Sequence, residues 1–190
     1  MESPPRAVVI GASAGAIEAL SAILPALPAD FGRAILIVVH LPPDRKSILA
    51  EIFADKCRLQ VREADDKEPI LANSVYFAPP DYHMLVETDH YLSLSNEEPV
   101  HYSRPSIDIL FTTAAEAFKS DLIGVILSGA NQDGAEGLRA IENAGGVVLV
   151  QQPEQASSSV MPRAALARCR SARALTLDGI ASALCELAAG

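Results

Sequence analysis

Three side chains whose types together could hydrolyse an ester follow strand-like runs of the sequence. The first run leads into "GASAGA", which contains Ser13; "ILIVVH" ends at His40; and "IGVILSG" leads into "ANQDG", which contains Asp133. In nucleophilic acyl transfer a serine attacks a carbonyl carbon, a histidine takes the serine's proton, and a carboxylate holds the imidazolium in the correct tautomer. These positions predict a catalytic site made of Ser13, His40 and Asp133.

Each of these residues also has a simpler explanation. A glycine-rich turn like that around Ser13 can cradle a nucleotide phosphate, His40 could be a structural histidine, and Asp133 stands where a helix N-cap belongs, with Glu136 placed for a capping box. The order Ser, His, Asp also differs from the order Ser, acid, His of the common hydrolase fold. A dinucleotide site, however, needs a third glycine and an acid after the second strand, where this chain has His40. Nucleotide binding is therefore the weaker alternative.

The elements that must position these residues alternate between strand-like and helical patterns. Runs rich in valine and isoleucine predict strands at 7–10, 34–39, 74–78, 122–127 and 146–150. Apolar periodicity predicts helices at 15–24, 47–56, 107–118, 134–144, 162–169 and 179–188. This alternation is typical of an α/β fold, a doubly wound, mostly parallel sheet flanked by helices, and the segment 83–95 predicts an added antiparallel hairpin. Ligands bind beyond the carboxyl ends of parallel strands, so we expect Ser13, His40 and Asp133 to meet there.

The composition limits the partners and the compartment. With 190 residues, 49% of them hydrophobic, the chain is expected to form one domain over residues 1–190. Its net charge of -9 opposes binding to nucleic acid. No apolar run is long enough for membrane insertion, and Glu2 with two prolines stands where an export signal would have basic residues. Cys57, Cys169 and Cys185 form no CxxC pair, so we expect a reduced, cytoplasmic setting without a bound metal.

Motifs along nearly the whole sequence point to one protein family. In order, they are "VVIGASAGAIEAL", "VYFAPPDYHM", "YSRPSIDILFTTAAEAF", "IGVILSGANQDGAEGLRAI" and "MPRAAL". Together they resemble the catalytic domain of the chemotaxis protein-glutamate methylesterases, the CheB type. The resemblance implies that the chain is a single catalytic domain of this type, in which Ser13 is the nucleophile, His40 the general base, and Asp133 the acid that orients His40.

The resemblance also implies a substrate and partners. Such serine esterases hydrolyse glutamate 5-O-methyl esters on the cytoplasmic domain of methylated chemoreceptors, release methanol in chemotaxis signal transduction, and in some cases deamidate glutamine. The ester mechanism requires no cofactor. Typical members carry an N-terminal receiver domain that covers the active site, whereas this sequence begins at the first strand of the catalytic domain. We therefore expect either a stand-alone enzyme, open or controlled by a separate regulatory protein, or a domain taken from a longer protein.

Two motifs depart from the usual family sequence. Members commonly read GASTGG and GMGxDGA, where this chain has Ala14 and Ala16 in the first motif and Ala130 and Asn131 in the second. We place a backbone oxyanion hole at the N–H groups of Ala14 and Ala130, which survive these changes because only side chains differ. The altered "GANQDG" loop leaves a second hypothesis open, a weakly active or inactive CheB-like module that binds receptor or signalling proteins.

Other polar residues near these motifs have structural interpretations. We interpret His83 and His101 as structural or surface histidines, and Ser106 and Asp108 as residues that start a helix. Arg104 would either orient a substrate carbonyl or acid, or pin the loop ahead of that helix.

Overall fold

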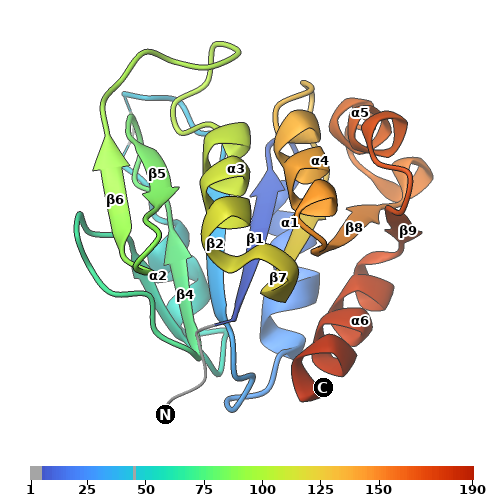
Figure 1. Ribbon diagram of the computed structural model, residues 1–190, viewed down its shortest axis with the longest axis horizontal. Helices are drawn as coiled ribbons and strands as arrows, with labels where there is room; N and C mark the ends of the chain where they lie inside the picture. The colour runs from blue at the N-terminus through green and yellow to red at the C-terminus, as the bar shows by residue number, and fades with distance from the viewer. Residues whose placement is uncertain (1–5, 45) are drawn as a thin grey trace.

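The main sheet of the protein contains seven strands, all of which pair in parallel (Figure 1). The computed structural model describes residues 6–44 and 46–190, so the stretch around Glu2, on which the expectation about export rests, lies outside the described residues. Across the sheet the strands run β3 (Gln60–Glu63), β4 (Ser74–Phe77), β2 (Ala34–Val39), β1 (Ala7–Ala12), β7 (Leu122–Ile126), β8 (Val147–Gln151) and β9 (Arg173–Leu175).

Helices cover both faces of this sheet. One face carries α1 (Ala16–Ile23), α2 (Leu49–Ala54) and α6 (Leu177–Ala189); the other carries α3 (Ile107–Phe118), α4 (Ala135–Asn143), α5 (Val160–Arg168) and the hairpin of β5 (His83–Val86) and β6 (Leu92–Ser95). Short 3₁₀ turns occupy Leu24–Ala26, Lys119–Asp121 and Pro153–Gln155. The central strands are buried throughout and divide the hydrophobic core into two clusters, one under each helical layer. Burial on both faces explains why these strands are continuous apolar runs instead of alternating ones.

The chain adds strands first on one side of β1 and then on the other, although all the strands stay parallel. From β1 the chain moves outward through β2 on one side, and after α3 it returns to β7 on the other side of β1. In Figure 1 the arrowhead of β1, with which β2 pairs in parallel, points to the upper edge of the molecule, where the loops before α3 and α4 also lie. A change of side of this kind opens a crevice at the carboxyl ends of the two central strands, which is where open α/β sheets bind ligands.

The predicted fold class is confirmed, with differences at the edges of the sheet. The hairpin is antiparallel as expected, but it forms a separate two-stranded sheet instead of extending the main one. The edge strands β3 and β9 were not predicted, because they are three or four residues long and half of their positions or more are polar or exposed. Within the described residues, none of the helices combines the length and the apolar character needed to span a bilayer.

Candidate active site

The pairing of β1 with β2 brings Ser13 and His40 to the same edge of the sheet. Ala12 and Val39, the last residues of these strands, are register partners, so the chains leave the sheet side by side. The His40 N–H donates to the carbonyl of Ala12 (3.1 Å), and the Ser13 N–H donates to the carbonyl of Ser128 after β7 (2.9 Å). Backbone bonds thus fix both turns relative to the strands.

The carboxylate of Asp133 is buried and holds the imidazole of His40. Asp133 Oδ2 lies 2.7 Å from His40 Nε2 and also accepts the backbone N–H of Ile107 (2.7 Å). Its other oxygen, Oδ1, accepts the N–H of Asp108 (3.0 Å) and the hydroxyl of Ser106 (3.1 Å). Four donors on two oxygens, on a side chain with no exposed surface, leave this carboxylate little freedom to move.

The same contacts decide the ionisation of Asp133. Burial acts to raise the pKa of the Asp133 carboxyl, but hydrogen bonds from His40 and from the N–H groups of Asp108 and Ile107 outweigh it and lower the pKa. The group is therefore an anion at neutral pH and favours positive charge on the adjacent imidazole.

The simpler explanation of Asp133, that it caps its own helix, is wrong. Asp133 does not cap its own helix: the N-cap of α4 is Gly134, which has no side-chain cap, and Glu136 pairs with an arginine of α5 instead of completing a capping box. Asp133 accepts N–H groups at the start of α3, while Asp108 of α3 accepts those of Gly134 (3.1 Å) and Gly137 (2.7 Å) at the start of α4. An acid at or just before the start of each helix thus binds N–H groups at the start of the other, because the two N-termini pack together.

Ser13 faces an open cavity of about 290 Å³ that His40 and Asn131 also line. The turn that carries Ser13 into α1 depends on Gly15, whose φ of 81° is in the left-handed region that glycine adopts without strain. In the part of the chain that the structure describes, the Ser13 hydroxyl has no hydrogen bond, and it shares the cavity with His40 without being bonded to it. The structure thus brings His40 and Asp133 into contact and places Ser13 beside them.

The backbone N–H groups of Ala14 and Ala130 belong to two loops. Ala14 follows Ser13 in the loop between β1 and α1, and Ala130 lies in the loop between β7 and α4. Both residues are exposed, and within the described ranges neither N–H has a hydrogen-bond acceptor. These groups are free to meet a ligand oxygen, and the oxyanion hole at these positions stays a prediction.

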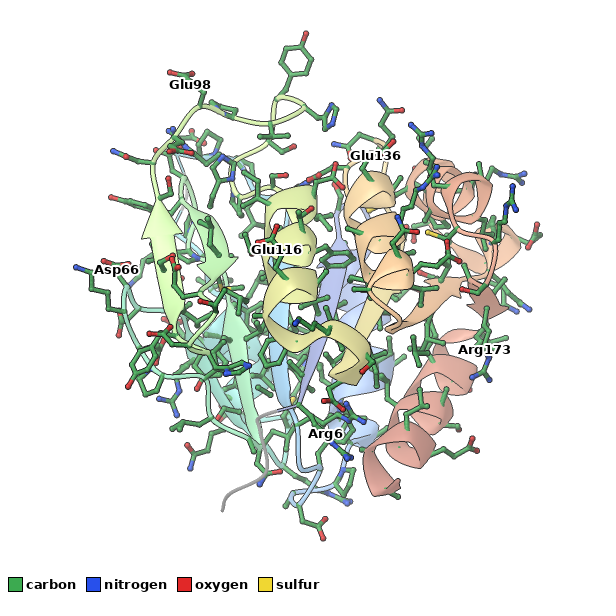
Figure 2. All side chains as sticks on the ribbon, viewed as in Figure 1. Arg6, Asp66, Glu98, Glu116, Glu136 and Arg173 are labelled. Atoms are coloured by element: carbon green, nitrogen blue, oxygen red, sulfur yellow. The ribbon has the colours of Figure 1, made fainter. Side chains whose placement is uncertain are left out.

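The loop between β6 and α3 forms the far wall of the cavity. Arg104 donates to Asp81 Oδ1 through Nη2 (2.6 Å) and Nε (3.0 Å), and its Nη1 donates to two carbonyls of the same loop, so it pins the loop. The loop ends in a tight turn in which His101 and Tyr102 both have positive φ, and the Tyr102 side chain is fully exposed. In Figure 2 the labelled Glu98 of this loop and Glu136 of α4 mark the upper edge of the molecule, while Arg6, ahead of β1, lies at the opposite edge.

The other histidines have no part in the cavity. His83 is buried; its Nε2 donates to the Glu98 carbonyl (3.0 Å) and its Nδ1 accepts the Ser106 N–H (3.1 Å), so it is structural. His101 is exposed and 3.7 Å from Asp108. Ser106 is the N-cap of α3, as expected. Among the described residues, no three His, Cys, Asp or Glu side chains gather as metal ligands would.

Sequence reasoning missed the role of Asn131. Its Oδ1 accepts the N–H of Asp133 (3.1 Å), and its Nδ2 lies 3.4 Å from His40 Nδ1. An Asn two residues before an Asp in a strand-to-helix loop is the signature of an Asx turn, which could have identified the first contact but not the second.

Comparison with known proteins identifies the family. A family model described as CheB methylesterase matches residues 8–184. The chain belongs to the CheB methylesterase family. The resemblance of the motifs to CheB enzymes is therefore confirmed over nearly the whole chain.

Individual CheB relatives support this assignment. The crystal structure of the Thermotoga maritima CheB methylesterase catalytic domain is 31% identical, superposes with a TM-score of 0.90, and covers 97% of this chain and 100% of that one. A protein-glutamate methylesterase/protein-glutamine glutaminase of Symbiobacterium thermophilum is 36% identical over 95% of this chain, which spans 50% of that relative. A relative in Leptospira interrogans, whose name gives the same activity provisionally, is 45% identical, and the match covers 96% of this chain and 94% of the relative.

Proposed function

We propose that this CheB-family chain is a serine esterase that hydrolyses glutamate 5-O-methyl esters on chemoreceptor proteins. Ser13 is the nucleophile, His40 is the general base and then the general acid, and Asp133 orients His40. The observation that supports this most strongly is the 2.7 Å contact between His40 Nε2 and the buried Asp133 carboxylate, at the wall of a cavity that also contains Ser13.

The first half of the reaction forms an acyl-enzyme. Ser13 Oγ bonds to the ester carbonyl carbon while its proton passes to His40 Nδ1, the ring nitrogen that Asp133 leaves unused. The bond from that carbon to the methoxy oxygen then breaks, and His40 returns the proton to the leaving oxygen, so methanol departs. The anion of Asp133 stabilises the imidazolium that exists between these two proton transfers.

The second half restores the enzyme. Water adds to the acyl carbon and gives a proton to His40 Nδ1, after which the bond from carbon to Ser13 Oγ breaks and Ser13 takes the proton back. The product is a glutamate carboxyl group, which ionises at neutral pH. With a glutamine substrate the same steps release ammonia, which accounts for deamidation by the same site.

Each half of the reaction passes through a tetrahedral intermediate, and the negative oxygen of that intermediate needs hydrogen-bond donors. The unpaired N–H groups of Ala14 and Ala130 supply them in our proposal, and loss of one such donor typically costs about 10² to 10³ in rate. Ala130 and Asn131 replace the Met and Gly of the usual motif, but these changes affect side chains only. The N–H groups of Ala14 and Ala130 therefore remain.

The target in this proposal is the methylated cytoplasmic domain of a chemoreceptor. The proposal rests on the family assignment and on the shape of the site, since an open cavity at the surface admits a side chain presented by another protein.

The experiment is methanol release from receptor protein methylated at glutamate. The parent chain should release methanol, Ser13→Ala should release none above background, and Asp133→Asn should be about 10⁴-fold slower because His40 takes the wrong tautomer. Ser171→Ala, an exposed serine bonded to Glu142, is the matched control and should keep full activity. No release from a folded parent chain would favour the alternative, a CheB-like module that binds receptor or signalling proteins without turnover.

A further inference from the structure

Asn131 closes a ring of hydrogen bonds around His40. The Asp133 N–H donates to Asn131 Oδ1 (3.1 Å), Asn131 Nδ2 faces His40 Nδ1 (3.4 Å), and His40 Nε2 faces Asp133 Oδ2 (2.7 Å). The ring therefore starts and ends on the same residue, once at its backbone and once at its carboxylate. Asn131 is the only one of its three members to which the proposed mechanism gives no role.

The direction of every bond in this ring follows from its one fixed donor. The backbone N–H of Asp133 can only donate, so the atom of Asn131 that faces it must be the amide oxygen. The amide nitrogen, which can only donate, then faces His40 Nδ1. For this contact to be a hydrogen bond, His40 Nδ1 must be an unprotonated acceptor, and the ring proton then sits on Nε2, directed at the Asp133 carboxylate.

We propose that Asn131 is a positioning residue that keeps His40 neutral in the free site, by donating to the Nδ1 lone pair until the Ser13 hydroxyl takes that place in the reaction. The inference rests on the proposed function, in which Nδ1 is the atom that takes the proton from Ser13. On the other side of the imidazole the anion of Asp133 favours the imidazolium, which cannot accept that proton. The donor from Asn131 stabilises the neutral ring and so opposes the effect of Asp133.

Among the described residues, few other charges reach this imidazole. Asp133 and Asn131 are the residues bonded to its ring. Of the remaining cavity residues, Asp81 and Arg104 are bonded to each other, and Tyr102 points to solvent. A change at Asn131 therefore acts on His40 with no second charged group in the described part of the chain bonded to the ring to compensate for it.

Two substitutions separate this role from a purely structural one. Asn131→Asp keeps an oxygen for the Asp133 N–H but puts a carboxylate where the donor to His40 was. Asn131→Ser also keeps a short acceptor for that N–H and removes the donor without adding charge. Asn131 does not have positive φ, so neither substitution strains the backbone.

The first measurement is the pH profile of kcat/KM for methanol release. Asn131→Asp should move the acid limb upward by roughly one to three pH units, because a carboxylate then faces the ring at close range. Asn131→Ser should lose about tenfold at neutral pH and regain the parent rate at alkaline pH, where the ring is neutral in any case. Gln132→Asp, which adds the same charge at the exposed neighbouring position, should reproduce the parent profile.

The second measurement is the ¹⁵N NMR spectrum of the His40 ring in the free protein. It should report a neutral ring with the proton on Nε2 in the parent at neutral pH, and an imidazolium that persists to higher pH in both variants. This readout needs no substrate, so it tests Asn131 even if the parent chain releases no methanol. A constant fractional loss of activity at every pH, or a His40 spectrum unchanged in both variants, would overturn the proposal.

Discussion

The candidate site has two halves, a rigid half around Asp133 and an open half around Ser13, and they are built in opposite ways. On one side Asp133 is fully buried, receives four hydrogen bonds, and is joined to the start of α3, while Asp108 of α3 is joined to the start of α4. On the other side Ser13 is partly exposed, its hydroxyl has no hydrogen bond within the described chain, and the neighbouring Ala14 is exposed.

The contrast assigns different tasks to the two halves. The group that must orient His40 is fixed before any substrate arrives, as electrostatic preorganisation requires. The groups that must touch the substrate stay free, because their partners are substrate atoms. Substitutions in the half around Asp133 should therefore change the stability of the fold more than substitutions in the half around Ser13. Each prediction below tests that difference.

The largest difference should appear between Asp133→Ala and Ser13→Ala. Asp133→Ala leaves N–H groups of α3, a hydroxyl and His40 without their acceptor, and should lower the free energy of unfolding by about 3 to 5 kcal/mol. Ser13→Ala should change it by less than about 0.5 kcal/mol while abolishing turnover. Denaturant unfolding of both variants measures the difference, and equal losses would contradict the division.

Two of the left-handed glycines, Gly134 and Gly15, one in each half of the site, give a matched comparison. A Cβ at Gly134 would lie 2.5 Å from the buried Ile126 side chain and 2.7 Å from Ile107, whereas one at Gly15 would meet the exposed Ser157 at 2.7 Å. Both substitutions are strained by positive φ, but the first must displace packed apolar core atoms, whereas the second meets serine side chains, those of Ser157 and, at 3.1 Å, Ser128. We expect Gly134→Ala to lower the free energy of unfolding by about 2 to 4 kcal/mol and Gly15→Ala by about 1 to 2 kcal/mol. A larger effect at Gly15, in thermal or chemical unfolding, would reverse the assignment of rigid and open halves.

The pH dependence of stability should differ between the two acids of the rigid half. Hydrogen bonds lower the pKa of Asp133 against burial, so its contribution is complete above the ordinary carboxyl range and is lost as the pH falls through the lowered pKa. Burial raises the pKa of Asp108, so its ionised form opposes folding above the raised pKa, and acid relieves that effect. Between about pH 5 and pH 2, Asp133→Asn should flatten the loss of stability with acid, and Asp108→Asn should steepen it. Unfolding free energies measured across this range check both signs, and equal slopes for the two variants would contradict them.

The smallest effect belongs to the rim of the open half. Tyr102 has φ of 62° and a fully exposed side chain, so its strained backbone gains no packing in return. Tyr102→Asn should raise the free energy of unfolding by roughly 0.5 kcal/mol, since asparagine tolerates this region better. Precise thermal unfolding measures the shift, and a decrease would mean that the tyrosine packs against the protein after all.

The sequence was sufficient to predict the sheet and the meeting of Ser13 with His40. Continuous apolar runs identify buried parallel strands, and two such strands in register must release their next residues at one edge. It also predicted that Asp133 meets His40, but not the helix start that Asp133 caps, because that start lies 26 residues earlier in the chain and meets the acid only through packing. For Asn131, the amide direction depends on a donor and an acceptor brought together by tertiary structure. The edge strands escaped prediction because short polar strands carry no periodic signal.

The exchange of caps between α3 and α4 also has a consequence for hydrogen exchange. The first N–H groups of a helix normally exchange rapidly with deuterium, because no carbonyl of the same helix accepts them. Here those of Ile107 and Asp108 are bonded to Asp133, just ahead of α4, and those of Gly134 and Gly137 are bonded to Asp108 of α3. Neither helix can fray from its start without breaking the other's contacts, so the two starts should open together and late. The region that orients His40 should then exchange more slowly than ordinary helix starts do, and transient opening elsewhere in the molecule should leave it assembled.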